Sequence, residues 1–175
     1  MVLLDGQPPE AFERLPSFPA FYNGFRRISA LLPSLARLGV GRLVYHADFA
    51  GLPAQAREMQ RLNHSSARLY RSLRDEFTKL PTSLDQARSS QDLGDRPLVV
   101  VTAARDALAG WLPLQDKMAT LSTNSSHRAV PYTHDSLITD QAAARTSAQA
   151  IRDVVKCGAI HHPPVKVINE RPQEC

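Results

Sequence analysis

The sequence predicts an α/β protein in which about three parallel strands are flanked by helices and interrupted by a long helical insertion. Apolar or β-branched runs occur at residues 2–4 and in PLVVVTA (97–103), and SHRAVPY (126–132) predicts a further, shorter strand. Segments with helical periodicity separate these runs, and such connections pair strands in parallel through right-handed crossovers. With 175 residues, 43% of them hydrophobic, the chain can bury a core. We therefore expect a core made of residues 1–8 and 96–156, a helical region over 9–95, and an irregular tail over 157–175.

The first strand is short. Val2, Leu3 and Leu4 form an apolar run that ends at an Asp-Gly pair and is soon followed by a Pro pair. Both pairs are typical of turns. The strand is therefore expected to end at Leu4, with Asp5 in the turn that follows.

The helical region carries an apolar stripe. Apolar residues recur there at three- and four-residue steps, which is the spacing of one helix face: Phe18, Phe21, Phe25, Ile28, Leu32, Leu35 and Leu38. Gly39 follows them and is a suitable end for the helix. We expect this stripe to face a core, along with Met59, Leu62, Leu69, Leu73 and Phe77 further on. Proline lacks an amide donor and is best tolerated in the first turn of a helix. We therefore expect the region to be divided into short helices by its prolines, Pro16, Pro19, Pro33, Pro53 and Pro81.

The third region alternates strands and helices. PLVVVTA is a continuous β-branched run, as in a strand that is covered on both faces. GWLPLQDKMATLST predicts an amphipathic helix with Leu114, Met118 and Leu121 on one side. SHRAVPY predicts a shorter strand, and DQAAARTSAQAIRDVVKC an alanine-rich last helix that Asp135, Ser136 and Asp140 help to cap.

Composition excludes several classes of site. The net charge of +4 comes from scattered arginines with few aromatics between them, which favours solvated helix faces over a nucleic-acid surface. Two cysteines, Cys157 and Cys175, without CxxC spacing argue against zinc and fit a reducing compartment. Adjacent His161 and His162 are too few for a metal site, and no cofactor motif occurs. No signal peptide or membrane-spanning run is recognisable, so a cytoplasmic protein is expected.

Several segments together carry a family resemblance. The segments are the opening VLLDGQPPEAFERLP, then RPLVVVTAARD with the following Trp111 and Gln115, and LSTNSSHRAVPYTHDSL. Together they resemble the C-terminal half of an α/β-hydrolase, of the bacterial group related to lipases, esterases and haloperoxidases. The resemblance covers about residues 1–156. It implies that the three strands are the sixth, seventh and eighth of the family sheet, lying side by side, and that residues 9–95 are a cap.

The resemblance also implies site residues. Asp106, just past the seventh strand, matches the acid of a catalytic triad, and His134, after the eighth, matches the general base. Asp5, after the sixth strand, is the alternative acid; Asp106 is preferred. An imidazole can take a hydroxyl proton at neutral pH when a buried carboxylate fixes its tautomer. Trp111 is expected to pack, not to bind substrate.

The nucleophile of the family is absent from these residues, because the chain contains no G-x-S-x-G. The expectation is a partial domain with an open sheet edge and an incomplete triad, inactive alone in ester hydrolysis. It would act on a small ester-like substrate only when completed by an N-terminal half. The alternative is a non-catalytic remnant or a module that binds a partner, or itself, through the helical cap and the open edge.

Overall fold

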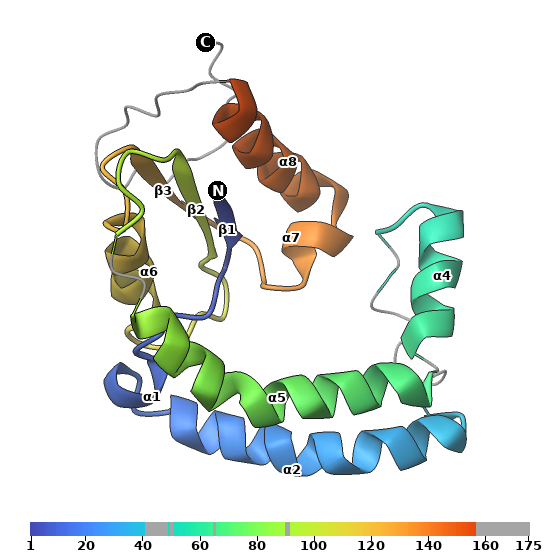
Figure 1. Cartoon of the computed structure of the whole chain (residues 1–175). Helices are drawn as coiled ribbons and strands as arrows, with labels where there is room; N and C mark the ends of the chain where they lie inside the picture. Colours follow the sequence, from blue (N-terminus) through green and yellow to red (C-terminus); the bar gives the residue numbers. More distant parts are fainter. Residues whose placement is uncertain (41–48, 50, 65, 90–91, 157–175) are drawn as a thin grey trace. The chain divides into compact units, whose positions relative to one another are not determined.

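The core is a three-stranded parallel sheet (Figure 1). The computed structural model describes residues 1–40, 49, 51–64, 66–89 and 92–156. Strands β1 (Val2–Leu4), β2 (Leu98–Ala103) and β3 (Ser125–Val130) lie in the order β1-β2-β3. Val2 pairs with Val99 and Leu98 with Ser125. The predicted α/β class and the side-by-side parallel strands are confirmed.

Strand β2 is central because its sequence suits burial on both faces. All six of its residues are buried. Val99 and Val101 pack on one side with Leu137 and Ala150, whereas Val100 packs on the other with Met118. Helix α8 (Gln141–Lys156) therefore covers one face and α6 (Trp111–Ala119) the other, as Figure 1 shows. Both helices lie where the sequence predicts them.

Two of the remaining five helices in the described residues, α2 (Phe18–Arg37) and α5 (Ala67–Arg88), are longer than expected. The other three are α1 (Ala11–Arg14), α4 (Ala54–His64) and α7 (Ser136–Thr139). The prediction that Pro33 and Pro81 end helices is wrong, since α2 and α5 continue through them. An internal proline removes one backbone hydrogen bond, and a long helix can survive that loss when its remaining bonds and packing hold it.

The chain divides into two units. One comprises Met1–Leu15 and the described chain from Arg88 onward; the other comprises Pro16–Ala87. The sequence placed these boundaries after residues 8 and 95. Residues 9–15 and 88–95 therefore belong with the sheet, and the helical unit is correspondingly shorter than the predicted cap. The predicted tail, 157–175, lies outside the described residues, together with Cys157, Cys175, His161 and His162.

In the helical unit, α2 packs against α5. The Tyr22 hydroxyl donates a 3.0 Å hydrogen bond to the Phe77 carbonyl, and the Phe25 and Phe77 rings lie 4.2 Å apart between centroids. The expectation that the whole stripe of α2 is buried is wrong: Phe21 and Ile28 are exposed. The same correction applies to Leu35, Leu38, Met59 and Leu62.

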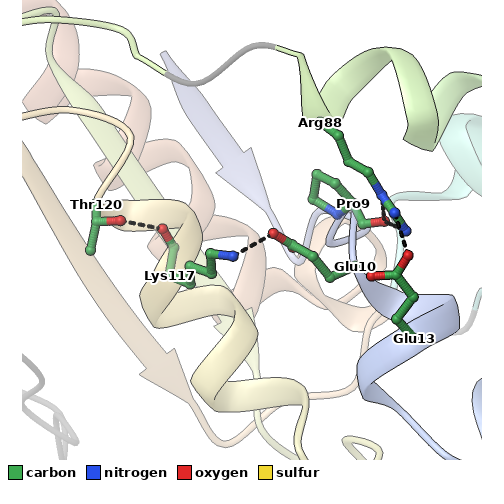
Figure 2. A network of polar contacts seen from close by, with 6 residues as sticks. All are labelled: Pro9, Glu10, Glu13, Arg88, Lys117 and Thr120. Carbon is green, nitrogen blue, oxygen red and sulfur yellow. Dashed lines mark hydrogen bonds and ion pairs between the residues drawn. The ribbon is translucent and has the colours of Figure 1, made fainter.

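Polar contacts fix the segment that follows β1 (Figure 2). The Arg88 guanidinium donates two 3.2 Å hydrogen bonds to the Pro9 carbonyl and pairs with the Glu13 carboxylate. Lys117 of α6 pairs with Glu10 at 2.6 Å, and this contact lowers the pKa of the Glu10 carboxyl. Residues 9–13 are thus held by both α6 and the end of α5.

Among the described residues, no helix is both long enough and apolar enough to cross a bilayer.

Candidate functional site

The candidate site lies where the parallel strands end. Asp5 is the first residue after β1, and its amide donates a 2.6 Å hydrogen bond to the Val101 carbonyl of β2. The carboxylate then takes the place of a further β1 carbonyl, because its Oδ1 accepts the Ala103 amide at 3.3 Å. Carboxyl ends of parallel strands are where sites form in α/β proteins. The hydrogen bonds of the sheet therefore set the orientation of the Asp5 carboxylate.

Asp5 is a buried carboxylate with three donors. Only 7% of the residue is exposed, and Oδ1 also accepts the Trp111 indole N–H at 2.8 Å. Its backbone φ is +47°, a left-handed conformation that aspartate tolerates better than most residues. A buried charge needs several partners to offset its loss of hydration. Together with His134, these donors satisfy both carboxylate oxygens.

His134 completes the pair. Its Nδ1 lies 2.8 Å from Asp5 Oδ2. An ionised carboxylate only accepts hydrogen bonds, so Nδ1 carries the proton and Nε2 keeps its lone pair. The imidazole is 68% exposed, and Nε2 has no partner within the described part of the chain. The hydrogen bond with Asp5 raises the pKa of His134 above its usual 6.5, against the opposing effect of partial burial. Nε2 is therefore free to exchange a proton.

The preferred pairing of Asp106 with His134 is not the one that the structure forms; the alternative acid, Asp5, takes that place. The Ala104 amide still donates a hydrogen bond to the Val130 carbonyl at the end of β3, and the Arg105 amide donates one to the Tyr132 carbonyl in the loop that follows. Asp106 follows them in an exposed turn, with a φ of +64°. The two residues between the strand end and Asp106 place that carboxylate in solvent.

A small motif holds the loop that carries His134. The Ser136 hydroxyl accepts the Thr133 amide at 2.9 Å and donates to the Thr133 carbonyl at 2.8 Å. Leu137 is 1% exposed in the core, and Ser147 of α8 donates a hydrogen bond to its carbonyl. The loop is thus fixed on both sides of the imidazole. Asp140 caps α8 as expected, accepting the amides of residues 142 and 143, whereas Asp135 and Ser136 begin the separate short helix α7 and do not cap α8.

Helix α6 supplies two residues to the site that the sequence assigned no polar role. Trp111, which is 9% exposed, packs as predicted but also donates to Asp5. Gln115 is fully buried and donates a 2.6 Å hydrogen bond to the Gly6 carbonyl, next to Asp5. The sequence signal was their spacing: residues four apart on a helix share one face.

A second aspartate–histidine pair, here extended by a hydroxyl, lies inside the same unit. His127 of β3 contacts Asp116 of α6 through Nδ1 at 2.5 Å, and Thr102 of β2 through Nε2 at 2.7 Å. The His127 side chain is 4% exposed and Thr102 is fully buried. A hydroxyl with no exposed surface cannot attack a substrate, so these contacts join β2, β3 and α6 structurally.

The described residues contain no cluster of three or more histidine, cysteine, aspartate or glutamate side chains that could hold a metal ion. A hollow of about 560 Å³ runs along α5, lined by Asp75, Lys79 and four neighbours on the same helix. Neither Asp5 nor His134 lines it.

The fold and the site define a class: an α/β protein with an Asp–His pair at the carboxyl end of a parallel sheet. Comparison with protein-family models, with curated proteins and with solved structures finds no match for this chain.

Proposed function

We propose that Asp5 and His134 are the acid and base of an α/β-hydrolase-type site that acts on an ester or a similar bond. The observation that carries the proposal is the 2.8 Å contact between a buried carboxylate and an exposed imidazole at the strand ends. The order of the strands and the helical insertion between β1 and β2 agree with it.

In this proposal, Nε2 of His134 takes the proton of an attacking hydroxyl. The Asp5 carboxylate holds the imidazole in the required tautomer and stabilises the imidazolium that forms. The same imidazolium then protonates the leaving alkoxide. Trp111 and the Ala103 amide keep the carboxylate in position by donating to its other oxygen.

The nucleophile and the oxyanion-hole donors would come from a complementing polypeptide with a G-x-S-x-G motif. No such motif occurs in the 175 residues, and no described hydroxyl contacts His134 Nε2. We accordingly propose that the chain has no esterase activity alone.

The test measures hydrolysis of p-nitrophenyl acetate by the purified chain, alone and mixed with the product of the reading frame directly upstream if that frame encodes G-x-S-x-G. The expected result is background alone and turnover on mixing, with a loss of about 10⁴-fold in Asp5→Ala and about 10⁶-fold in His134→Ala. Asp106→Ala is the matched control and is expected to keep full turnover. Turnover on mixing that survives His134→Ala would contradict the proposed base. Turnover by the chain alone that disappears in His134→Ala would contradict the proposed missing nucleophile.

A second candidate is a non-catalytic module that pairs through the β1 edge. Within the described residues β1 pairs only with β2. The Met1 carbonyl and the Asp5 amide bond to β2, so the alternating backbone groups of Val2 point away from the sheet. Such an edge can accept another strand. Concentration-dependent association in light scattering that Val2→Pro removes would favour this candidate.

A further inference from the structure

Helix α2 exposes an apolar stripe. Its members follow at steps of seven, three, four and three residues, so they share one side of the helix. They are Phe21 (51% exposed), Ile28 (57%), Leu31 (63%), Leu35 (38%) and Leu38, which follows the helix (79%). The face that packs on α5 is a different one, formed by Tyr22, Phe25 and their neighbours.

The charges of α2 are all of one sign. Between Phe18 and Arg37 the helix contains no acidic residue and three arginines. At about 100° per residue, Arg27 borders the stripe, while Arg26 and Arg37 lie further round on the polar side. All three are exposed and form no ion pair with the described residues. Residues 16–87 contain ten Lys or Arg against five Asp or Glu, whereas the rest of the chain has a net charge of −1.

These features select among possible occupants. A second copy would bring two helices without acids, each from a unit of charge +5, against one another, and like charges oppose that pairing. An anionic surface is attracted by the same charges. Phe, Ile and Leu along one side, with arginine on the other, describe a helix that lies in the plane of a bilayer surface. The stripe runs over about 25 Å of helix, since each residue rises about 1.5 Å.

We propose that the α2 stripe docks this protein reversibly on a bilayer surface that contains anionic lipid. Phe21, Ile28 and Leu31 enter the boundary between headgroups and acyl chains. Arg27, supported by the positive charge of the unit, provides the preference for anionic headgroups, and each such arginine near the surface strengthens binding by about fivefold. The docking is independent of Asp5 and His134.

The experiment measures co-sedimentation of the full chain with vesicles of phosphatidylcholine alone and of phosphatidylcholine with one quarter phosphatidylglycerol. Binding is expected only to the anionic vesicles, and it is expected to weaken in high salt because salt screens the attraction. Ile28→Gln with Leu31→Gln is expected to raise the lipid concentration for half-binding by at least about tenfold. Arg27→Gln is expected to raise it by about fivefold.

The matched control is Ile151→Gln with Val155→Gln, which removes two exposed apolar side chains from α8 in the other unit. It is expected to bind as the unchanged chain does, and so is Asp5→Asn. Circular dichroism confirms that each variant retains its helices. Failure to bind anionic vesicles, or equal loss in the α2 and α8 variants, would overturn the proposal. A different outcome is self-association of the chain in sedimentation. If Ile28→Gln with Leu31→Gln abolishes it, the stripe binds a second copy instead. Capture of an acidic protein without any vesicle binding would assign the stripe to that protein.

Discussion

Asp5 and His134 are 129 positions apart in the chain, yet Asp5 Oδ2 lies 2.8 Å from His134 Nδ1. Asp5 follows β1 and His134 follows β3, so the two side chains meet across the end of the strand between them.

Replacing Asp5 is expected to change the titration of His134. The carboxylate stabilises the imidazolium, so the pKa of His134 stands above 6.5, and Asp5→Asn should bring it down because the charge is removed while an oxygen acceptor remains. Nuclear magnetic resonance of the imidazole protons across pH 5 to 9 measures this pKa. Asp106→Asn is the control and should leave it unchanged; an equal shift in both variants would contradict the assigned pairing.

The same contact predicts how stability depends on pH. Since the pKa of His134 is raised in the folded state, its contribution is fully present below the unfolded value near 6.5 and is lost as pH rises through the folded value. The difference in free energy of unfolding between the unchanged chain and His134→Gln should therefore shrink from pH 5.5 to pH 8.5. Urea unfolding at a series of pH values measures it. A difference that grows with pH would have the wrong sign for this contact.

Removing the indole donor is expected to destabilise the fold. Trp111→Phe keeps a ring but leaves a buried carboxylate oxygen with one donor fewer, a loss of about 1.5 to 3 kcal/mol. Thermal and urea unfolding measure the change. In an Asp5→Asn background the same substitution should cost less, because the acceptor is neutral. Equal costs in both backgrounds would show that Trp111 acts through packing alone.

The contacts of buried His127 with Asp116 and Thr102 yield a separate prediction. Thr102→Val preserves shape but leaves Nε2 of His127 buried without a partner, which should cost about 1 to 3 kcal/mol of stability. Thr102→Ser keeps the hydroxyl and serves as the matched control in urea unfolding. If Thr102→Val leaves the free energy of unfolding unchanged while Thr102→Ser lowers it, the hydroxyl contributes nothing to stability and the methyl packing of Thr102 dominates.

The sheet and its covering helices could be predicted because their signals are local. The run Leu98–Ala103 is apolar or β-branched at nearly every position, which suits a strand covered on both faces, and Leu114 and Met118 show the helical spacing of a core face. The apolar residues of α2 have equally clear spacing, but spacing alone does not say which of them another part of the protein covers. Phe18 and Tyr22 are buried, whereas Phe21 and Ile28 on a neighbouring side are exposed.

The sequence by itself determined the α/β class and the parallel strands, and its resemblance to a family offered Asp5 and Asp106 as the carboxylates that could pair with His134. Only the tertiary structure decided between Asp5 and Asp106, which both follow a strand and both adopt a positive φ. The physical reason is that hydrogen bonds across the sheet, from Asp5 to Val101 and from Ala103 back to Asp5, aim one carboxylate at the imidazole. Two extra residues after β2 leave the other in a solvent-exposed turn, and neither effect is visible in the order of residues along the chain.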